Sequence, residues 1–359
     1  MKRSNILSNF AIQNTKITKL SIKQTIILGI ESSCDDTSAS IIKNSAILSN
    51  IIAGQKVHEL YGGVVPELAS RAHQQNIVPV VDAAVKKAGI SADEIDAVAF
   101  TCGPGLLGSL LVGTSFAKAF ALGKNIPLID VNHMHGHILA HFIDDEEKEK
   151  PTFPFICMTV SGGHTQLVLV KDYLEMEVLG STIDDAAGEA FDKTAKILGL
   201  PYPGGPLIDK YAQLGDENKF TFAKPRMEKY DFSFSGLKTS ILYFIQKEMK
   251  ANPNFIKEEL ENICASVQKA ILDVLFYKLE LVAEDYKINQ IAIAGGVSAN
   301  SGLRNRLEKI GKEKNWKTFI PKFEYCTDNA AMIAMTGYFM FQKGMFTDQT
   351  ISANSRMKI

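Results

Sequence analysis

The sequence predicts an α/β protein whose two lobes close on a central cleft. Predicted strands and helices alternate along the chain, which is the pattern of α/β proteins. A strand, a polar turn and a second strand begin near residue 26 and again near residue 155, so the two halves of the chain open alike. The chain has 359 residues. A single hydrophobic core stops growing at about 250–300 residues, so two lobes are expected.

The first lobe is expected to cover residues 25–150. Ile26–Ile30 is an apolar run that predicts a buried strand, and Ala39–Ile42 is its hairpin partner across a polar turn. A helix, a strand, a second helix and a further strand follow at residues 67–88, 97–101, 109–122 and 128–131. The charged run Asp144–Lys150 and the prolines after it predict the linker between the lobes.

The second lobe is expected to cover residues 151–328. It opens with strands at residues 155–160 and 166–170. Helices at residues 189–198, 236–250 and 256–286 and a strand at 290–294 follow. The apolar C-terminal helix, residues 329–347, is expected to complete the first lobe. Residues 1–24 lack the apolar block of a secretory signal and are expected to form a poorly ordered extension.

Composition argues against a membrane protein and gives no global sign of a nucleic-acid binder. Basic and acidic side chains number 39 and 40, so any basic patch must be local. No run of about 18 apolar residues, the length that spans a bilayer, occurs. The five cysteines are widely spaced and form no C-x-x-C pair, which favours a reduced, cytoplasmic location.

A cluster of histidines predicts a metal site. His133, His137 and His141 recur at intervals of four, so on a helix they could share one face, and paired histidines at that spacing are typical metal ligands. The alternative is a polar helix face or satisfied core histidines. Asp328, just before the last helix, is a candidate third ligand or else an N-cap. Two imidazoles and one carboxylate suit Fe²⁺ with open coordination positions, or Zn²⁺.

Two glycine-bearing turns are candidates for ligand contact. In the turn 161–165, glycines let a ligand approach the backbone, where successive N–H groups can bind an anion. The turn 295–300 could admit a nucleotide base, with Asn300 offering its amide to the purine. Ordinary turns, the second with Ser298 or Asn300 as a helix cap, remain the alternatives. The turn 103–108 lacks the lysine of a P-loop.

Four carboxylates precede Lys193 in the segment 184–193, and Asp209 follows the Pro-Gly-Gly-Pro turn 203–206. Such groups can hold ribose hydroxyls or accept protons in catalysis. The alternative is an acid-decorated helix N-terminus, which the helix dipole stabilises.

Nine sequence blocks occur in the order of one family. They are ILGIESSCDDTSAS, ELASRAH, CGPGLLGSLLVG, NHMHGHILAH, VSGGHTQLV, DDAAGEAFDKTAKILGLPYPGGP, FSFSGLKT, AGGVSAN and CTDNAAMIA. Over roughly Ile26 to Gly344 the chain resembles the bacterial TsaD proteins, the tRNA adenosine threonylcarbamoyltransferases. The resemblance implies the two-lobed fold of the actin-like, Hsp70-like and sugar-kinase-like ATPases, which agrees with the layout above.

The resemblance also implies roles for individual residues. The metal, usually iron in this family, would be held by His133, His137 and Asp328. Donor contacts would come from Thr159, Val160, Ser161, Gly162 and Gly163, and nucleotide contacts from Asp192, Gly205, Asp209 and Asn300. The chain departs from the family at His135, where many relatives have Glu.

The implied reaction joins threonylcarbamoyl-AMP to adenosine 37 of tRNAs that read ANN codons. The implied partners are a shorter, actin-like paralogue (TsaB) and a small P-loop ATPase (TsaE). The general base is left open between Glu31, Asp35 and Asp36, because their turn should face the cleft. Three other functions are weighed: a metalloprotease, which the absence of H-E-x-x-H disfavours, a small-molecule kinase and a non-catalytic scaffold.

Overall fold

The computed structural model describes residues 24–144, 149–223 and 227–359. The predicted extension, residues 1–24, lies outside this part of the chain apart from its last residue. Within the described residues, no helix combines the length and the apolar character needed to cross a membrane.

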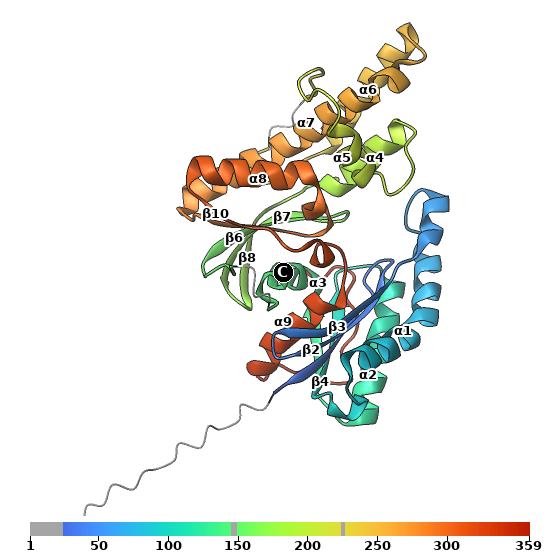
Figure 1. The fold of residues 1–359 in the computed structure, drawn as a ribbon, viewed down its shortest axis with the longest axis vertical. Helices are drawn as coiled ribbons and strands as arrows, with labels where there is room; N and C mark the ends of the chain where they lie inside the picture. The colour runs from blue at the N-terminus through green and yellow to red at the C-terminus, as the bar shows by residue number, and fades with distance from the viewer. Residues whose placement is uncertain (1–23, 145–148, 224–226) are drawn as a thin grey trace, which may run out of the picture.

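Five strands form the first sheet, in the order β3-β2-β1-β4-β5 (Figure 1). They are β1 (Ile26–Glu31), β2 (Thr37–Lys43), β3 (Ala46–Ala53), β4 (Ala97–Gly103) and β5 (Leu128–Asn132). The predicted hairpin is confirmed, because β1 pairs antiparallel with β2 and Ile30 lies opposite Ala39. On its other edge β1 pairs parallel with β4. Every residue of β1 is buried, since helices cover both faces of the sheet.

The second sheet repeats this topology. Its order is β10-β9-β6-β7-β8, so the opening strand again lies between an antiparallel hairpin partner and a parallel strand. The strands are β6 (Phe155–Val160), β7 (Thr165–Asp172), β8 (Glu175–Ser181), β9 (Gln290–Ala294) and β10 (Lys317–Phe319). The duplication predicted from the two strand-turn-strand openings is therefore confirmed. The lobe boundaries, residues 25–150 and 151–328, stay predictions.

Helices arrange the molecule in layers (Figure 1). The outer face of the first sheet packs on α1 (Pro66–Ala88) and α2 (Leu107–Lys124). Between the sheets lie α3 (His133–Leu139) and α9 (Ala330–Gln342), whose apolar side chains share one core with both sheets. Beyond the second sheet lie α4 (Ala187–Ile197), α5 (Gly205–Ala212), α6 (Ser235–Ala251), α7 (Phe255–Tyr286) and α8 (Ser301–Lys314).

The start of α9 sits directly on the first sheet. A Cβ at Gly29 would lie 2.4 Å from the carbonyl oxygen of Ala330, so only glycine allows this approach. The predicted helix 329–347 is too long: α9 ends at Gln342, and the chain leaves it at Gly344, where φ is 67°. The local reason is the left-handed conformation at this glycine, which ends many helices. The close seat of α9 on β1 brings the residues before the helix to the end of that strand.

Candidate metal and nucleotide site

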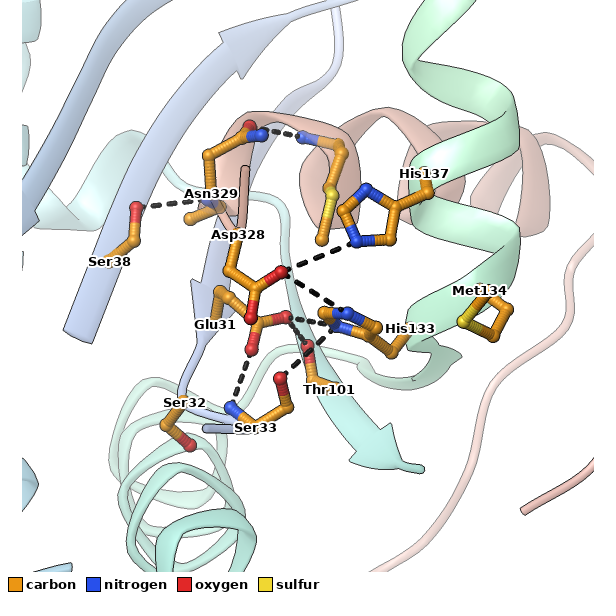
Figure 2. A network of polar contacts seen from close by, with 12 residues as sticks. Glu31, Ser32, Ser33, Ser38, Thr101, His133, Met134, His137, Asp328 and Asn329 are labelled. Atoms are coloured by element: carbon orange, nitrogen blue, oxygen red, sulfur yellow. Dashed lines mark hydrogen bonds and ion pairs between the residues drawn. The ribbon is translucent and has the colours of Figure 1, made fainter. Parts of the chain in front are cut away.

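The metal candidates come from two elements of the central layer (Figure 2). His133 and His137 lie one turn apart on α3, which begins at the N-cap Asn132. Asp328 precedes α9, whose N-cap is Asn329, because the Asn329 side chain accepts the N–H of Met332. The cap alternative for Asp328 is thereby excluded, and its carboxylate faces the two imidazoles.

One oxygen of Asp328 is shared by both histidines. Its Oδ1 lies 3.4 Å from Nε2 of His133 and 3.3 Å from Nε2 of His137. These separations are long for N–H···O hydrogen bonds, which measure about 2.7–3.2 Å. Two ligand atoms held about 2.1 Å from one ion, at angles of about 90–110°, lie about 3.0–3.4 Å apart. These two separations fit ligands around one ion, and the three groups form a cluster able to hold a metal, with their ligand atoms all within 4.8 Å of one another.

The nitrogens of His137 support this reading. Among the described residues, neither Nδ1 nor Nε2 of this buried ring makes a hydrogen bond of good geometry. Burial lowers the pKa of His137, so its ring is neutral and Nε2 can carry a lone pair. A neutral imidazole is the form that ligates metals.

His133 is held from its other side by a buried carboxylate (Figure 2). Its Nδ1 lies 3.0 Å from Oε2 of Glu31 and 3.2 Å from Oγ of Ser33. Burial by itself lowers the pKa of His133, but Glu31 and Asp328 raise it well above its usual value. In the same way burial raises the pKa of Asp328, and the imidazoles reverse that effect and lower it.

Glu31 does not line the cleft. Its side chain is fully buried, and its oxygens also accept hydrogen bonds from the Ser33 N–H and the Thr101 hydroxyl, both at 2.5 Å. Burial raises the pKa of Glu31, but the charge of His133 and the hydrogen bonds from His133 and Ser33 together outweigh it, so the net pKa is lowered. Glu31 is therefore an ionised group placed to orient His133.

The other clustered histidines lie elsewhere. His141 belongs to the 3₁₀ turn Ala140–Phe142, because α3 ends at Leu139, and its Nε2 lies 2.9 Å from the carbonyl oxygen of Ile293. The expectation that it shares the face of His133 and His137 is wrong, since the change of helix type shifts its direction. His135 is half-buried, and burial lowers its pKa to about 4.

A cavity of about 820 Å³ opens beside the metal candidates. Asp35 and Asp36 line it from the first sheet, with His133 and Asp328. Ser161, Gly162 and Gly163 line it from the second sheet. Of the predicted donor segment, Thr159 and Val160 are buried in β6 and lie beneath this turn, outside the lining.

A smaller cavity of about 250 Å³ continues from the larger one. The two share Gly162, Asp192, Pro203 and Gly296 in their walls. The predicted nucleotide residues Asp192, Gly205, Asp209 and Asn300 all line the smaller cavity. The structure thus brings together groups that the sequence separates by more than a hundred residues.

Hydrogen bonds fix the walls of this smaller cavity. Oδ1 of Asp192 accepts the N–H groups of Gly204 and Gly205 at 2.8 and 2.9 Å, while its Oδ2 accepts none from the described residues. Asp209 accepts the Ser301 N–H and hydroxyl, both at 2.8 Å.

The side-chain amide of Asn300 already makes hydrogen bonds within the protein. Its oxygen caps α8 by accepting the Leu303 N–H at 2.8 Å, so the cap alternative holds for this residue. Its nitrogen donates to Gln268 at 2.7 Å. An amide nitrogen has two protons, so one donor remains for a ligand.

Sequence reasoning missed several residues of the site. Ser33 and Thr101 complete the setting of Glu31, and Lys56, His58 and Glu59 of the 3₁₀ turn Lys56–Tyr61 line the larger cavity. Ser33 stands inside the block ILGIESSCDDTSAS, which is the one signal that could have found it, and Thr101 directly precedes the block CGPGLLGSLLVG. The turn after β3 carries no motif.

Comparisons with known proteins agree with this geometry. The family model for TsaD, tRNA N6-adenosine threonylcarbamoyltransferase, matches residues 46–335. The chain is 62% identical over 332 residues to the tRNA N6-adenosine threonylcarbamoyltransferase of Christiangramia forsetii, which covers 92% of this chain and 98% of that relative. It is 60% identical over 338 residues to the protein of the same name from Riemerella anatipestifer, covering 94% of this chain and 99% of the relative.

Solved structures share the fold at low identity. Full-length HypF, in a phosphate- and nucleotide-bound form, matches 90% of this chain and 48% of its own with a TM-score of 0.58 at 14% identity. HypF of T. kodakarensis matches 91% of this chain and 49% of its own with a TM-score of 0.56. These likenesses confirm the actin-like ATPase fold. The family model and the relatives show more: the chain belongs to the TsaD family, the tRNA N6-adenosine threonylcarbamoyltransferases.

Proposed function

We propose that the chain transfers the threonylcarbamoyl group of threonylcarbamoyl-AMP to N6 of adenosine 37 in tRNAs that read ANN codons, with release of AMP. The observation that carries this proposal is the joining of two cavities. One is lined by His133 and Asp328 of the metal cluster, and the other is small enough for a single nucleoside. A donor that spans them would place its nucleoside in one and its acyl group beside the ion.

His133, His137 and Asp328 are the proposed ligands of one divalent ion. Fe²⁺ is the first choice and Zn²⁺ the second, because two imidazoles and one carboxylate suit both ions. When bound, the ion would supply a Lewis acid that polarises donor oxygens. Glu31 holds His133 in the orientation that this ligation requires.

The donor would lie along the shared wall of the cavities. Asp192, with one unused carboxylate oxygen, is the proposed partner of the ribose, together with Asp209, and Asn300 offers its remaining amide proton to the adenine. A Cβ added to Gly162 or Gly163 would meet nothing within 4 Å, so a substrate can approach the backbone N–H groups of this turn closely. Those groups would bind the oxygen on which charge builds.

The transfer itself needs a proton acceptor. The N6 amine attacks the carbamoyl carbon, and the bond from that carbon to the phosphate oxygen breaks, so AMP leaves with the electron pair. Asp35 is the proposed acceptor of the N6 proton because it lines the larger cavity, whereas Glu31 is buried behind His133. Neighbouring Asp36 lines the same wall.

The proposal includes partners and a place in the cell. A formal net charge of −1 gives little general attraction for RNA, so tRNA binding would be shared with other proteins. A TsaB-like paralogue and a TsaE-like P-loop ATPase are the proposed partners, and the cytoplasm, where tRNA is used, is the proposed location.

Nucleoside mass spectrometry tests the proposal. The chain and its proposed partners are incubated with ready-made threonylcarbamoyl-AMP and either a tRNA transcript with adenosine 37 or the same transcript with guanosine 37. Threonylcarbamoyladenosine is expected from the first transcript alone. The Asp328→Ala variant, which lacks one proposed ligand, is expected to give none. Product from the guanosine transcript, or no product from the adenosine transcript, would contradict the proposal.

A further inference from the structure

Arg304, in the first turn of α8, joins two segments that border the site from different sides. Its Nε donates to the carbonyl oxygen of Ser298 at 2.7 Å, and its Nη2 donates to the carbonyl oxygen of Pro321 at 2.9 Å. The same Nη2 lies 3.1 Å from Sγ of Cys326. Ser298 and Cys326 are fully buried, so these contacts reach from the surface of α8 into the interior.

The first of these segments forms a wall of the smaller cavity. Ser298 lies in the 3₁₀ turn Gly296–Ala299, and Gly296, Val297 and Ala299 line that cavity. Asn300 follows immediately and caps α8. A shift of the Ser298 carbonyl would therefore move the backbone on which a nucleoside rests.

The second segment leads to the metal candidate Asp328. Pro321 precedes the 3₁₀ turn Phe323–Tyr325, and Cys326 follows it, two residues before Asp328. The Cys326 N–H also donates to the carbonyl oxygen of Phe323, at 3.2 Å, which closes this short loop on itself. Contacts that hold Pro321 and Cys326 in place therefore also fix the path of the backbone that leads to Asp328.

Only an arginine can make this set of contacts. Its guanidinium is a rigid planar fork, whereas lysine offers one compact donor group. The Phe323 ring lies 3.8 Å from the central carbon of the guanidinium and covers it, a cation–π contact that restrains the plane of the fork. The two segments are thus held at a fixed separation.

We propose that Arg304 is a positioning residue that couples the metal cluster to the nucleoside cavity. The inference rests on the proposed function, because it takes the smaller cavity as the site of the donor's adenosine. An ion bound by Asp328 would restrict the movement of the loop 321–326. The hydrogen bonds of Arg304 link this loop to the turn 296–299, so the turn would be restricted as well. Such coupling is reciprocal: metal must tighten adenosine binding by the same factor as adenosine tightens metal binding.

Adenosine is the right probe for this coupling. It has no phosphate or carboxylate, so an effect of metal on its affinity does not come from ligation of the ion by those groups. Its dissociation constant is measured by calorimetry for the full chain, with and without saturating Zn²⁺. We expect Zn²⁺ to tighten adenosine binding in the unchanged protein by about tenfold, inside the usual range of coupling between sites.

Two substitutions of Arg304 and a matched control at Arg306 test whether the coupling depends on Arg304. Arg304→Met keeps the apolar stem and loses every donor, and the coupling factor should fall close to one. Arg306→Met removes a neighbouring arginine of α8 whose Nη1 pairs with Asp273 at 2.5 Å, away from both segments. That control should keep the full coupling factor. If Arg304→Met does not fold, Arg304→Lys decides, with a coupling factor below that of the unchanged protein.

The outcomes separate this inference from the proposed function. A wild-type coupling factor retained in the folded Arg304 variants, or a factor of one in the unchanged protein, overturns the role of Arg304 alone. Failure of the unchanged protein to bind adenosine overturns the assignment of the smaller cavity and the inference with it. Far-UV circular dichroism and the urea midpoint confirm that each variant is folded.

Discussion

The Nδ1 atom of His133 lies 3.0 Å from the Oε2 atom of Glu31, whose side chain is fully buried. A histidine that ligates a metal commonly donates the N–H of its other ring nitrogen to such a carboxylate. This hydrogen bond fixes the tautomer and the orientation of the ring. This pair therefore sets where Nε2 of His133 points.

Replacing Glu31 by Gln should weaken metal binding. The neutral amide leaves His133 without its charged partner, and changes of this kind cost about 10–100-fold in metal affinity. Competition of the variant with a chromophoric chelator for Zn²⁺ measures the loss. The matched control is Glu59→Gln, which changes a carboxylate in the wall of the same cavity but leaves His133 untouched. Equal affinities for Glu31→Gln and the unchanged protein would remove Glu31 from this role.

The Asp35→Asn substitution should slow transfer without weakening donor binding. Loss of a positioned proton acceptor costs about 10²–10⁴-fold in rate. Single-turnover formation of threonylcarbamoyladenosine gives the rate, and calorimetry with threonylcarbamoyl-AMP gives the affinity. An unchanged rate would exclude Asp35 as the base. A rate that falls in step with affinity would place it in donor binding instead.

The strands that carry the site and the helical spacing of its histidines can be predicted from the sequence, because both depend on local patterns of residues. Apolar runs such as Ile26–Ile30 locate the strands, and the spacing of His133 and His137 matches one helical turn. Strand ends and helix turns are set largely by neighbours in sequence, so the strands and the histidine pair are predicted without tertiary information.

The features of the site that the sequence does not predict depend on contacts between residues that are distant in the chain. His141 continues the four-residue spacing, yet α3 ends at Leu139, and no local signal marks that end. The direction of Glu31 depends on Thr101 and His133, which lie 70 and 102 residues away in sequence. Arg304 is one of several basic residues on its helix until the structure brings Pro321 beside it.

The N-cap of the metal helix is tied to the end of the described chain. Asn132 accepts the N–H of Met134 at 2.9 Å, and its amide nitrogen donates to the carbonyl oxygen of Lys358 at the same distance. Asn132→Ala loses both bonds and should lower the free energy of unfolding by about 1–2 kcal/mol.

Asn132→Asp separates the two contributions. Aspartate caps a helix as well as asparagine does, but it cannot donate to Lys358. We expect a urea midpoint between those of Asn132→Ala and the unchanged protein, and a weaker affinity for Zn²⁺ than in the unchanged protein. A variant identical to the unchanged protein in both measurements would show that Lys358 does not help to seat α3.

Adjacent glycines in the turn after β9 should respond very differently to a methyl group. Gly295 has φ of 86°, and an added Cβ would lie 2.6 Å from the carbonyl oxygen of Val160. Gly295→Ala should therefore lower the free energy of unfolding by about 2 kcal/mol or more. A Cβ at Gly296 meets nothing within 4 Å, so Gly296→Ala should unfold at nearly the same urea concentration as the unchanged protein. Equal midpoints for the two variants would contradict this account of the turn.

The contribution of Asp36 to the stability of the metal-free protein should fall as pH rises through the range in which Asp36 titrates. Burial, followed by the charges of Asp328, Asp35 and Glu31, raises the pKa of Asp36 from 3.8 to about 7. Between pH 4 and pH 7 the folded protein keeps a proton on Asp36 that the unfolded chain has lost. Folding then binds a proton at this carboxyl group, so the contribution of Asp36 to the free energy of unfolding decreases with pH, by up to about 1 kcal/mol per pH unit.

The Asp36→Asn variant isolates this group, because asparagine resembles the protonated acid and does not titrate. Urea unfolding of the metal-free variant and the unchanged protein is compared from pH 4 to pH 8. Near pH 4 the two should differ little, since Asp36 is protonated in the folded state. Above pH 7 the variant should be the more stable, as it carries no buried charge facing Asp328 and Asp35. A difference in unfolding free energy that stays constant across the range would mean that Asp36 is ionised throughout, with a pKa near its ordinary value.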